Sequence, residues 1–105
     1  MDSDARRAKN ETFFRESNEL IELDAARNHT QEFDCICECS SRGCLQRLDL
    51  TRSEYEAVRR YPSRFVVAPG HEDPRLETVV ERYPDYFVVE KHGLAGAIAR
   101  ASDPR

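Results

Sequence analysis

The sequence predicts an α+β domain with a long N-terminal helix, then a small mixed sheet with two short helices and a zinc-bearing β-hairpin turn. Residues 4–28 contain neither Gly nor Pro, which favours a long helix. Short β-branched and aromatic runs follow, separated by turn residues and helical patterns. All four cysteines lie between Cys35 and Cys44. With 105 residues, 39% of them hydrophobic, we expect a modest core.

The helix over residues 4–28 carries apolar residues at three-, four- and seven-residue steps, which predicts an amphipathic helix. These residues are Phe13, Phe14, Leu20, Ile21 and Ala25. We therefore divide the chain into an N-terminal amphipathic helix (1–30) and a zinc-binding α+β domain (31–105). Docking of the helix on the domain is favoured over a dimerisation helix, because the stripe covers few heptads.

Residues 32–37 and 45–50 are predicted strands that pair as an antiparallel hairpin, with the cysteine segment as their turn. Thr51 and Glu54 then form a predicted capping box, in which each side chain binds the backbone N–H of the other residue. The helix that follows runs to about Arg60, with Tyr55 and Val58 inward, and Tyr61-Pro62 ends it.

A buried strand is predicted over residues 65–68, and Pro69-Gly70 turns the chain. Asp73-Pro74 is typical of a helix start, so a second short helix is expected to end before Pro84. Its apolar face would hold Leu76, Val79, Val80 and Tyr83. A last strand covers residues 86–90, Gly93 and Gly96 are expected to loosen the chain after it, and residues 102–105 are expected to fray.

The cysteine segment favours a metal site. Zinc prefers four thiolate or imidazole ligands in a tetrahedron, and Cys37, Cys39 and Cys44 can supply three from one turn. Same-face neighbours in a strand lie ~6–7 Å apart, so Cys35 cannot join them and is predicted to be a buried strand residue. His71, after the Pro69-Gly70 turn, is the predicted fourth ligand; Cys35 or His92 in its place stays open.

Such a Cys3His site fills all four zinc positions with protein ligands, so it would be structural and add to folding stability. A disulfide pairing and a thiol redox switch are less favoured. No secretory signal or apolar stretch of membrane-spanning length occurs, so we expect a cytoplasmic protein without a membrane partner. Disulfides are uncommon in that compartment.

Three motifs resemble a family of small bacterial proteins with no assigned activity. They are the C-E-C-x4-C turn ending at Cys44, the V-x-P-G-H-E loop around His71, and the V-V-E-K strand ending at Lys91. The resemblance spans residues 10 to 105 and implies ligand positions at Cys37, Cys39, Cys44 and His71.

These observations predict a non-enzymatic, zinc finger-like protein that binds a partner, most readily another protein, in a regulatory or adaptor role. The alternative is a nucleic-acid-binding zinc domain using the basic segment 42–64, although the net charge of −4 argues against it. Less favoured are a thiol redox sensor and a zinc hydrolase with Glu72 as general base. A dimer through the N-terminal helix remains open.

Overall fold

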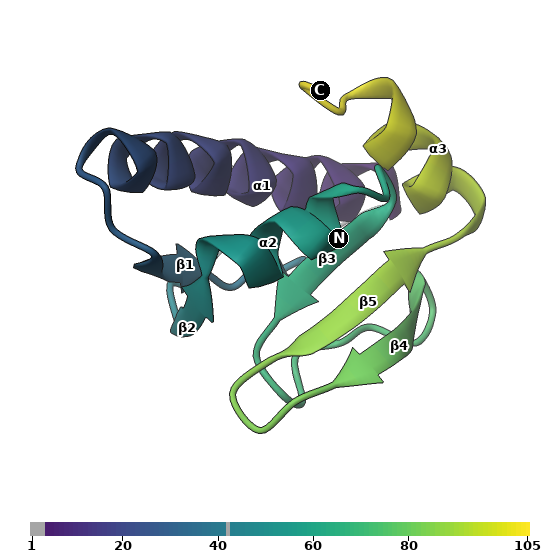
Figure 1. The fold of residues 1–105 in the computed structure, drawn as a ribbon. Coiled ribbons are helices and arrows are strands. Elements are labelled where there is room, and N and C mark those ends of the chain that lie inside the picture. Colours follow the sequence, from purple (N-terminus) through teal and green to yellow (C-terminus); the bar gives the residue numbers. More distant parts are fainter. Residues whose placement is uncertain (1–3, 42) are drawn as a thin grey trace.

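The computed structural model describes residues 4–41 and 43–105, and within these ranges the chain forms three helices and five strands (Figure 1). The α+β class is confirmed. The expected single mixed sheet is wrong, because the strands form two separate antiparallel sheets. The first pairs β1 (Glu32–Ile36) with β2 (Arg47–Thr51). The second has the order β3-β5-β4, from β3 (Arg64–Val67), β4 (Glu77–Arg82) and β5 (Phe87–Lys91).

The helices join the two sheets into one core. Helix α1 (Asp4–Arg27) runs along one side of the molecule and packs against β1 and α3 (Gly93–Ala101) (Figure 1). Helix α2 (Arg52–Arg59) packs against β2 and β3, and so bridges the sheets. The main apolar cluster includes side chains from both sheets, among them Leu48, Leu50, Tyr55, Phe65 and Val89. Among the described residues, none of the helices combines the length and the hydropathy of a membrane span.

The hairpin and the helix after it form as predicted. Cys35 pairs with Leu48 across the β1–β2 ladder. At the start of α2, the Glu54 N–H donates to the Thr51 hydroxyl at 3.1 Å, and the Thr51 N–H donates to the Glu54 carboxylate at 2.8 Å. This capping box satisfies N–H groups that have no partner inside the helix. Tyr55 and Val58 of α2 are buried, as expected.

Helix α1 lies where the sequence places it, but the predicted apolar stripe is divided between the buried and the exposed side, and Ile21 is partly buried against the core. Phe14 and Ala25 are buried, whereas Phe13 and Leu20 are 62% and 69% exposed. The buried side of α1 is largely polar, and its polar members are Glu11, Thr12, Arg15, Asn18 and Glu22. Apolar spacing failed here because the surface that α1 covers offers charged and backbone partners for these side chains.

Those partners are specific. Lys91 on β5 is buried and forms ion pairs with Glu11 on α1 and Glu77 on β4. The Arg15 guanidinium donates to the carbonyls of Pro62 and Ala99 at 2.5 and 2.8 Å. A buried charge without a partner costs several kcal/mol, so these contacts fix how α1 sits on the sheet.

The predicted second helix is wrong, because residues 77–82 form strand β4. The turn before it does form: the N–H groups of Leu76 and Glu77 both donate to the Asp73 carbonyl. Beyond that turn, β-branched Thr78, Val79 and Val80 favour a strand, and Thr78 and Val79 pair with Glu90 and Val89 of β5. The register shifts between Val79 and Glu81, and this interrupts the alternation of apolar and polar residues by which a strand is recognised in a sequence.

The segment expected to be loose is helix α3, and the tail after it makes ion pairs. Arg105 contacts carboxylates of Glu19, Glu22 and Glu56, and Asp103 pairs with Arg59. Gly93 has a φ of +59°, a left-handed conformation that suits glycine at the helix start. The two glycines were expected to loosen this segment. In the structure they instead allow helix α3 to form and to pack closely.

Gly96 gives a direct test of that packing. A Cβ atom at this position would lie 2.9 Å from the backbone carbonyl oxygen of Lys91, which cannot move without disturbing β5. We expect Gly96→Ala to lower the free energy of unfolding by about 1–2 kcal/mol, because the clash outweighs the gain in helix propensity. Urea denaturation followed by circular dichroism measures this; unchanged or higher stability would contradict the close contact.

Candidate metal centre

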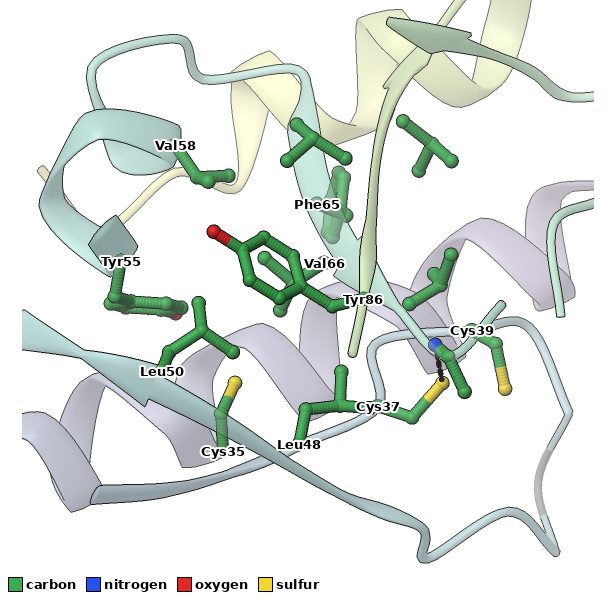
Figure 2. Close-up of a cluster of buried hydrophobic side chains, with 14 of the residues drawn as sticks. Cys35, Cys37, Cys39, Leu48, Leu50, Tyr55, Val58, Phe65, Val66 and Tyr86 are labelled. Atoms are coloured by element: carbon green, nitrogen blue, oxygen red, sulfur yellow. Dashed lines mark hydrogen bonds between the residues drawn. The ribbon is translucent and has the colours of Figure 1, made fainter. Parts of the chain in front are cut away.

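The cysteine turn is held between the two sheets. The Cys37 N–H donates to the Gln46 carbonyl at 2.9 Å, which extends the hairpin one step beyond β1 and β2. The chain then runs beside β3, where the Glu38 N–H donates to the Val66 carbonyl at 2.8 Å. The Ala68 N–H points at the Cys37 sulfur, 3.1 Å away (Figure 2). These three bonds fix the first cysteine of the group relative to both sheets.

Glu38, between the two cysteines, points into the core and is fully buried. Its Oε2 accepts from the Asn18 side chain at 2.8 Å and from the Tyr55 hydroxyl at 3.1 Å, and its Oε1 accepts from the Val66 N–H at 3.0 Å. Burial raises the pKa of Glu38, while the hydrogen bonds from Asn18 and Val66 lower it. This carboxylate therefore ties the cysteine turn to α1, α2 and β3.

A type II turn positions His71. The His71 N–H donates to the Ala68 carbonyl at 2.9 Å, Pro69 occupies the second position, and Gly70 has the positive φ of 90° that the third position requires. Glu72 then binds back along the same loop, with its Oε1 accepting from the Gly70 N–H at 2.9 Å. Because the turn follows β3 directly, the imidazole reaches the cysteine turn beside that strand.

The four predicted ligand residues come together. The Sγ atoms of Cys37, Cys39 and Cys44 and a ring nitrogen of His71 all lie within 4.8 Å of one another. His71 Nδ1 is 3.5 Å from the sulfurs of both Cys37 and Cys44. In a tetrahedral zinc site, bonds of 2.3 Å to sulfur and 2.0–2.1 Å to nitrogen put N and S about 3.6 Å apart. The donor set and its spacing fit a zinc ion.

The thiols influence each other strongly. Hydrogen bonding from the Cys37 thiol lowers the pKa of Cys39 to about 5, against the opposing effect of burial. The same contact, with burial, raises the pKa of Cys37, and burial raises that of Cys44. Without a metal ion, three thiols this close together therefore favour the state in which only one of them is ionised. A bound divalent cation would favour ionisation of all three.

Cys35 stands apart from the group, as predicted. It is 0% exposed in β1, and Figure 2 shows it beside Leu48 and Leu50 in the core. Burial raises the pKa of its thiol well above the usual value. His92 precedes α3, and His29, with a φ of 57°, follows α1. Among the described residues, neither histidine joins the cysteine group.

A surface hollow of about 460 Å³ opens beside the group, with Cys39, Cys44 and His71 in its wall. Across it, Arg7 on α1 forms an ion pair with Asp73 at 3.1 Å. Cys37 and Cys39 are buried and Cys44 is partly buried; of the three, Cys39 and Cys44 line the hollow.

The basic segment 42–64 is not a free cationic surface along its length. Arg59 is 3% exposed and forms ion pairs with Glu19 and Asp103. Arg64 forms an ion pair with Glu90 and lies over the Tyr61 ring. Arg42, also part of the prediction, lies outside the described residues. The positive charge of this segment is therefore partly neutralised by carboxylates that are distant in the sequence.

Sequence reasoning missed Glu38. A signal for it exists, because successive side chains in an extended segment point to opposite sides. If Cys37 and Cys39 both face a metal ion, the residue between them must face the core. A carboxylate forced into the core needs donors, which the structure supplies from Asn18, Tyr55 and the β3 backbone.

Comparison of the chain with protein-family models, curated proteins and solved structures finds no match. The resemblance to a small bacterial family therefore stays a prediction from its motifs. The geometry defines the class of site: three thiols and one imidazole on two loops, gathered closely enough to hold a metal ion.

Proposed function

We propose that Cys37, Cys39, Cys44 and His71 hold a structural zinc ion in a protein that acts by binding a protein partner, in a regulatory or adaptor role. The observation that carries the zinc assignment is the gathering of three sulfurs and one nitrogen within 4.8 Å. Thiolate and imidazole ligands suit zinc, and four protein ligands leave no position for a substrate. Partner binding is supported by large apolar side chains that are exposed outside α1, among them Leu45 and Leu94.

In this proposal the zinc ion joins the cysteine turn of the β1–β2 hairpin to the loop that follows β3 in the other sheet. Cys37 and Cys39 extend from β1, Cys44 precedes β2, and His71 follows β3. The ion supplies charge neutralisation for three thiolates, and its binding free energy adds to folding. The Ala68 N–H, aimed at the Cys37 sulfur, stabilises the negative charge on that ligand.

Native mass spectrometry of the full chain tests the ligand set. We expect one zinc ion per chain in the wild type and in Cys35→Ser. We expect about a 100-fold or greater loss of zinc affinity in His71→Ala, because one of four ligands is gone. Competition with a chromophoric chelator measures the affinity. A wild-type chain purified without metal, or zinc loss in Cys35→Ser with retention in His71→Ala, would overturn the assignment.

A further inference from the structure

The outer side of α1 carries a straight row of exposed residues, here called the outer row. Its members follow one another at alternating steps of four and three residues, which keeps them on one line along the helix. They are Lys9, Phe13, Glu16, Leu20, Leu23 and Arg27.

The outer row contains large apolar side chains in the middle. Phe13 is 62% exposed, Leu20 69% and Leu23 48%. The opposite side of the same helix buries Arg15 and Asn18. Helix α1 therefore exposes large apolar side chains while it buries charged and polar ones beside Phe14 and Ala25, unlike a helix that only covers a core. Three exposed apolar residues at heptad spacing are the pattern of a helix–helix interface.

We propose that the outer row binds the outer row of a second copy of this chain, with the two α1 helices antiparallel. In this register Leu20 lies opposite Leu23 of the second copy, and Glu16 lies opposite Arg27. Two-fold symmetry repeats each pair, so the interface holds two leucine pairs and two ion pairs. Phe13 lies opposite residue 30 of the second copy, just beyond the end of the facing helix.

Charge selects this register over the others. A parallel pair would place Glu16 on Glu16 and Arg27 on Arg27, which is repulsive in both positions. Shifting the antiparallel pair by one heptad would place Lys9 opposite Arg27 and Glu16 opposite Leu20. Of these three arrangements, only the proposed one puts leucine on leucine and opposite charges together, and such complementarity fixes orientation in paired helices.

The overlap runs from Glu16 to Arg27, which is about 18 Å of helix. That is short for a stable coiled coil, so the dimer is weak and depends on concentration, with a dissociation constant of about 10–100 µM. The residues involved are exposed and none belongs to the metal centre. The dimer is therefore independent of the proposed zinc site, and substitutions in the outer row leave the monomer fold intact.

Sedimentation equilibrium of the full, metal-loaded chain, from about 5 µM to 1 mM, tests the dimer. We expect the average mass to rise toward that of a dimer, and Leu20→Asp to weaken association at least about tenfold by placing a carboxylate against an apolar partner. Circular dichroism and zinc content should stay unchanged. A chain that remains monomeric throughout, or association that Leu20→Asp leaves unaltered, would overturn the proposal, even if the outer row bound a different protein.

A charge swap tests the register. Glu16→Arg and Arg27→Glu should each weaken association about tenfold, because each puts like charges together twice. The double variant should restore it to within about threefold of wild type. Lys9→Glu makes the same change in charge as Arg27→Glu but lies outside the overlap, so it should change association little. Failure of the double variant to restore association would exclude this register.

Discussion

Removing the metal with excess EDTA is expected to lower the midpoint of thermal unfolding by more than about 15 °C, which corresponds to several kcal/mol for a chain of this size. The proposed ion links the cysteine turn to the loop after β3, and without it three sulfurs lie close together with no neutralising charge. The hollow beside Cys39 and Cys44 gives the chelator access. Differential scanning calorimetry before chelation, after it, and after zinc is added back measures the effect.

Cys37→Ser is the variant that should reproduce the effect of EDTA. Cys37 is the proposed ligand that is 0% exposed, and its sulfur accepts a hydrogen bond from the Ala68 N–H. Serine keeps the size of the side chain but binds zinc poorly, so its unfolding midpoint should equal that of the chelated wild type and should not respond to EDTA. Equal midpoints indicate that metal loss, and not a local packing defect, causes the effect.

Cys35→Ala is the control on the same hairpin. Cys35 is as buried as Cys37 but packs against Leu48 and Leu50. Its replacement should cost about 1–2 kcal/mol by removing a buried sulfur, and the variant should keep its zinc and its response to EDTA. If chelation removed zinc and left the midpoint unchanged, the ion would have no structural role.

The hairpin, the capping box and the ligand set could be predicted because short-range rules govern them. Thr51 and Glu54 interact within one turn of helix, and Pro69-Gly70 can form few turns other than the one that presents His71. Cys35 could be separated from the other cysteines because the rise of a strand keeps successive same-face residues apart. Each of these inferences needs only the local backbone.

The other outcomes depended on contacts between distant residues. Apolar residues at helical spacing over residues 76–83 favoured a helix, but β4 forms because β5 offers it a partner. The face of α1 that is buried was decided by Lys91 and by carbonyls of Pro62 and Ala99, up to 84 residues away in sequence. No pattern within residues 4–28 carries that information, so Phe13 and Leu20 were wrongly assigned to the buried side together with Phe14 and Ala25.

The second large effect is expected at Glu38, where Glu38→Ala should lower the free energy of unfolding by about 3–5 kcal/mol. The substitution leaves a cavity and removes the acceptor for Asn18, Tyr55 and the Val66 N–H, all in a buried environment. Leaving buried donors without acceptors costs more than the hydrogen bonds themselves contribute. Urea denaturation of the zinc-loaded proteins measures the difference.

A graded series separates the carboxylate from the space that it fills. Tyr55→Phe removes one of the three donors and should cost about 1 kcal/mol. Glu38→Gln keeps the volume but turns one carboxylate oxygen into an NH2 group, which must face the Asn18 amide or the Val66 N–H. Its cost in free energy of unfolding should therefore lie between those of Tyr55→Phe and Glu38→Ala, at about 2 kcal/mol. If Glu38→Gln had the same free energy of unfolding as the wild type, the protein would not require both carboxylate oxygens of Glu38 as acceptors.

Glu38 also predicts how the core and the metal centre depend on each other. It lies between Cys37 and Cys39 in the chain, so its hydrogen bonds help to fix the backbone that positions both thiol groups. Glu38→Ala should therefore weaken zinc binding about 10–100-fold, as loss of outer-shell support does at other metal sites, although no ligand has changed. The chelator competition used for His71→Ala measures this. Wild-type affinity in a destabilised Glu38→Ala chain would show that the metal turn holds its shape without the core.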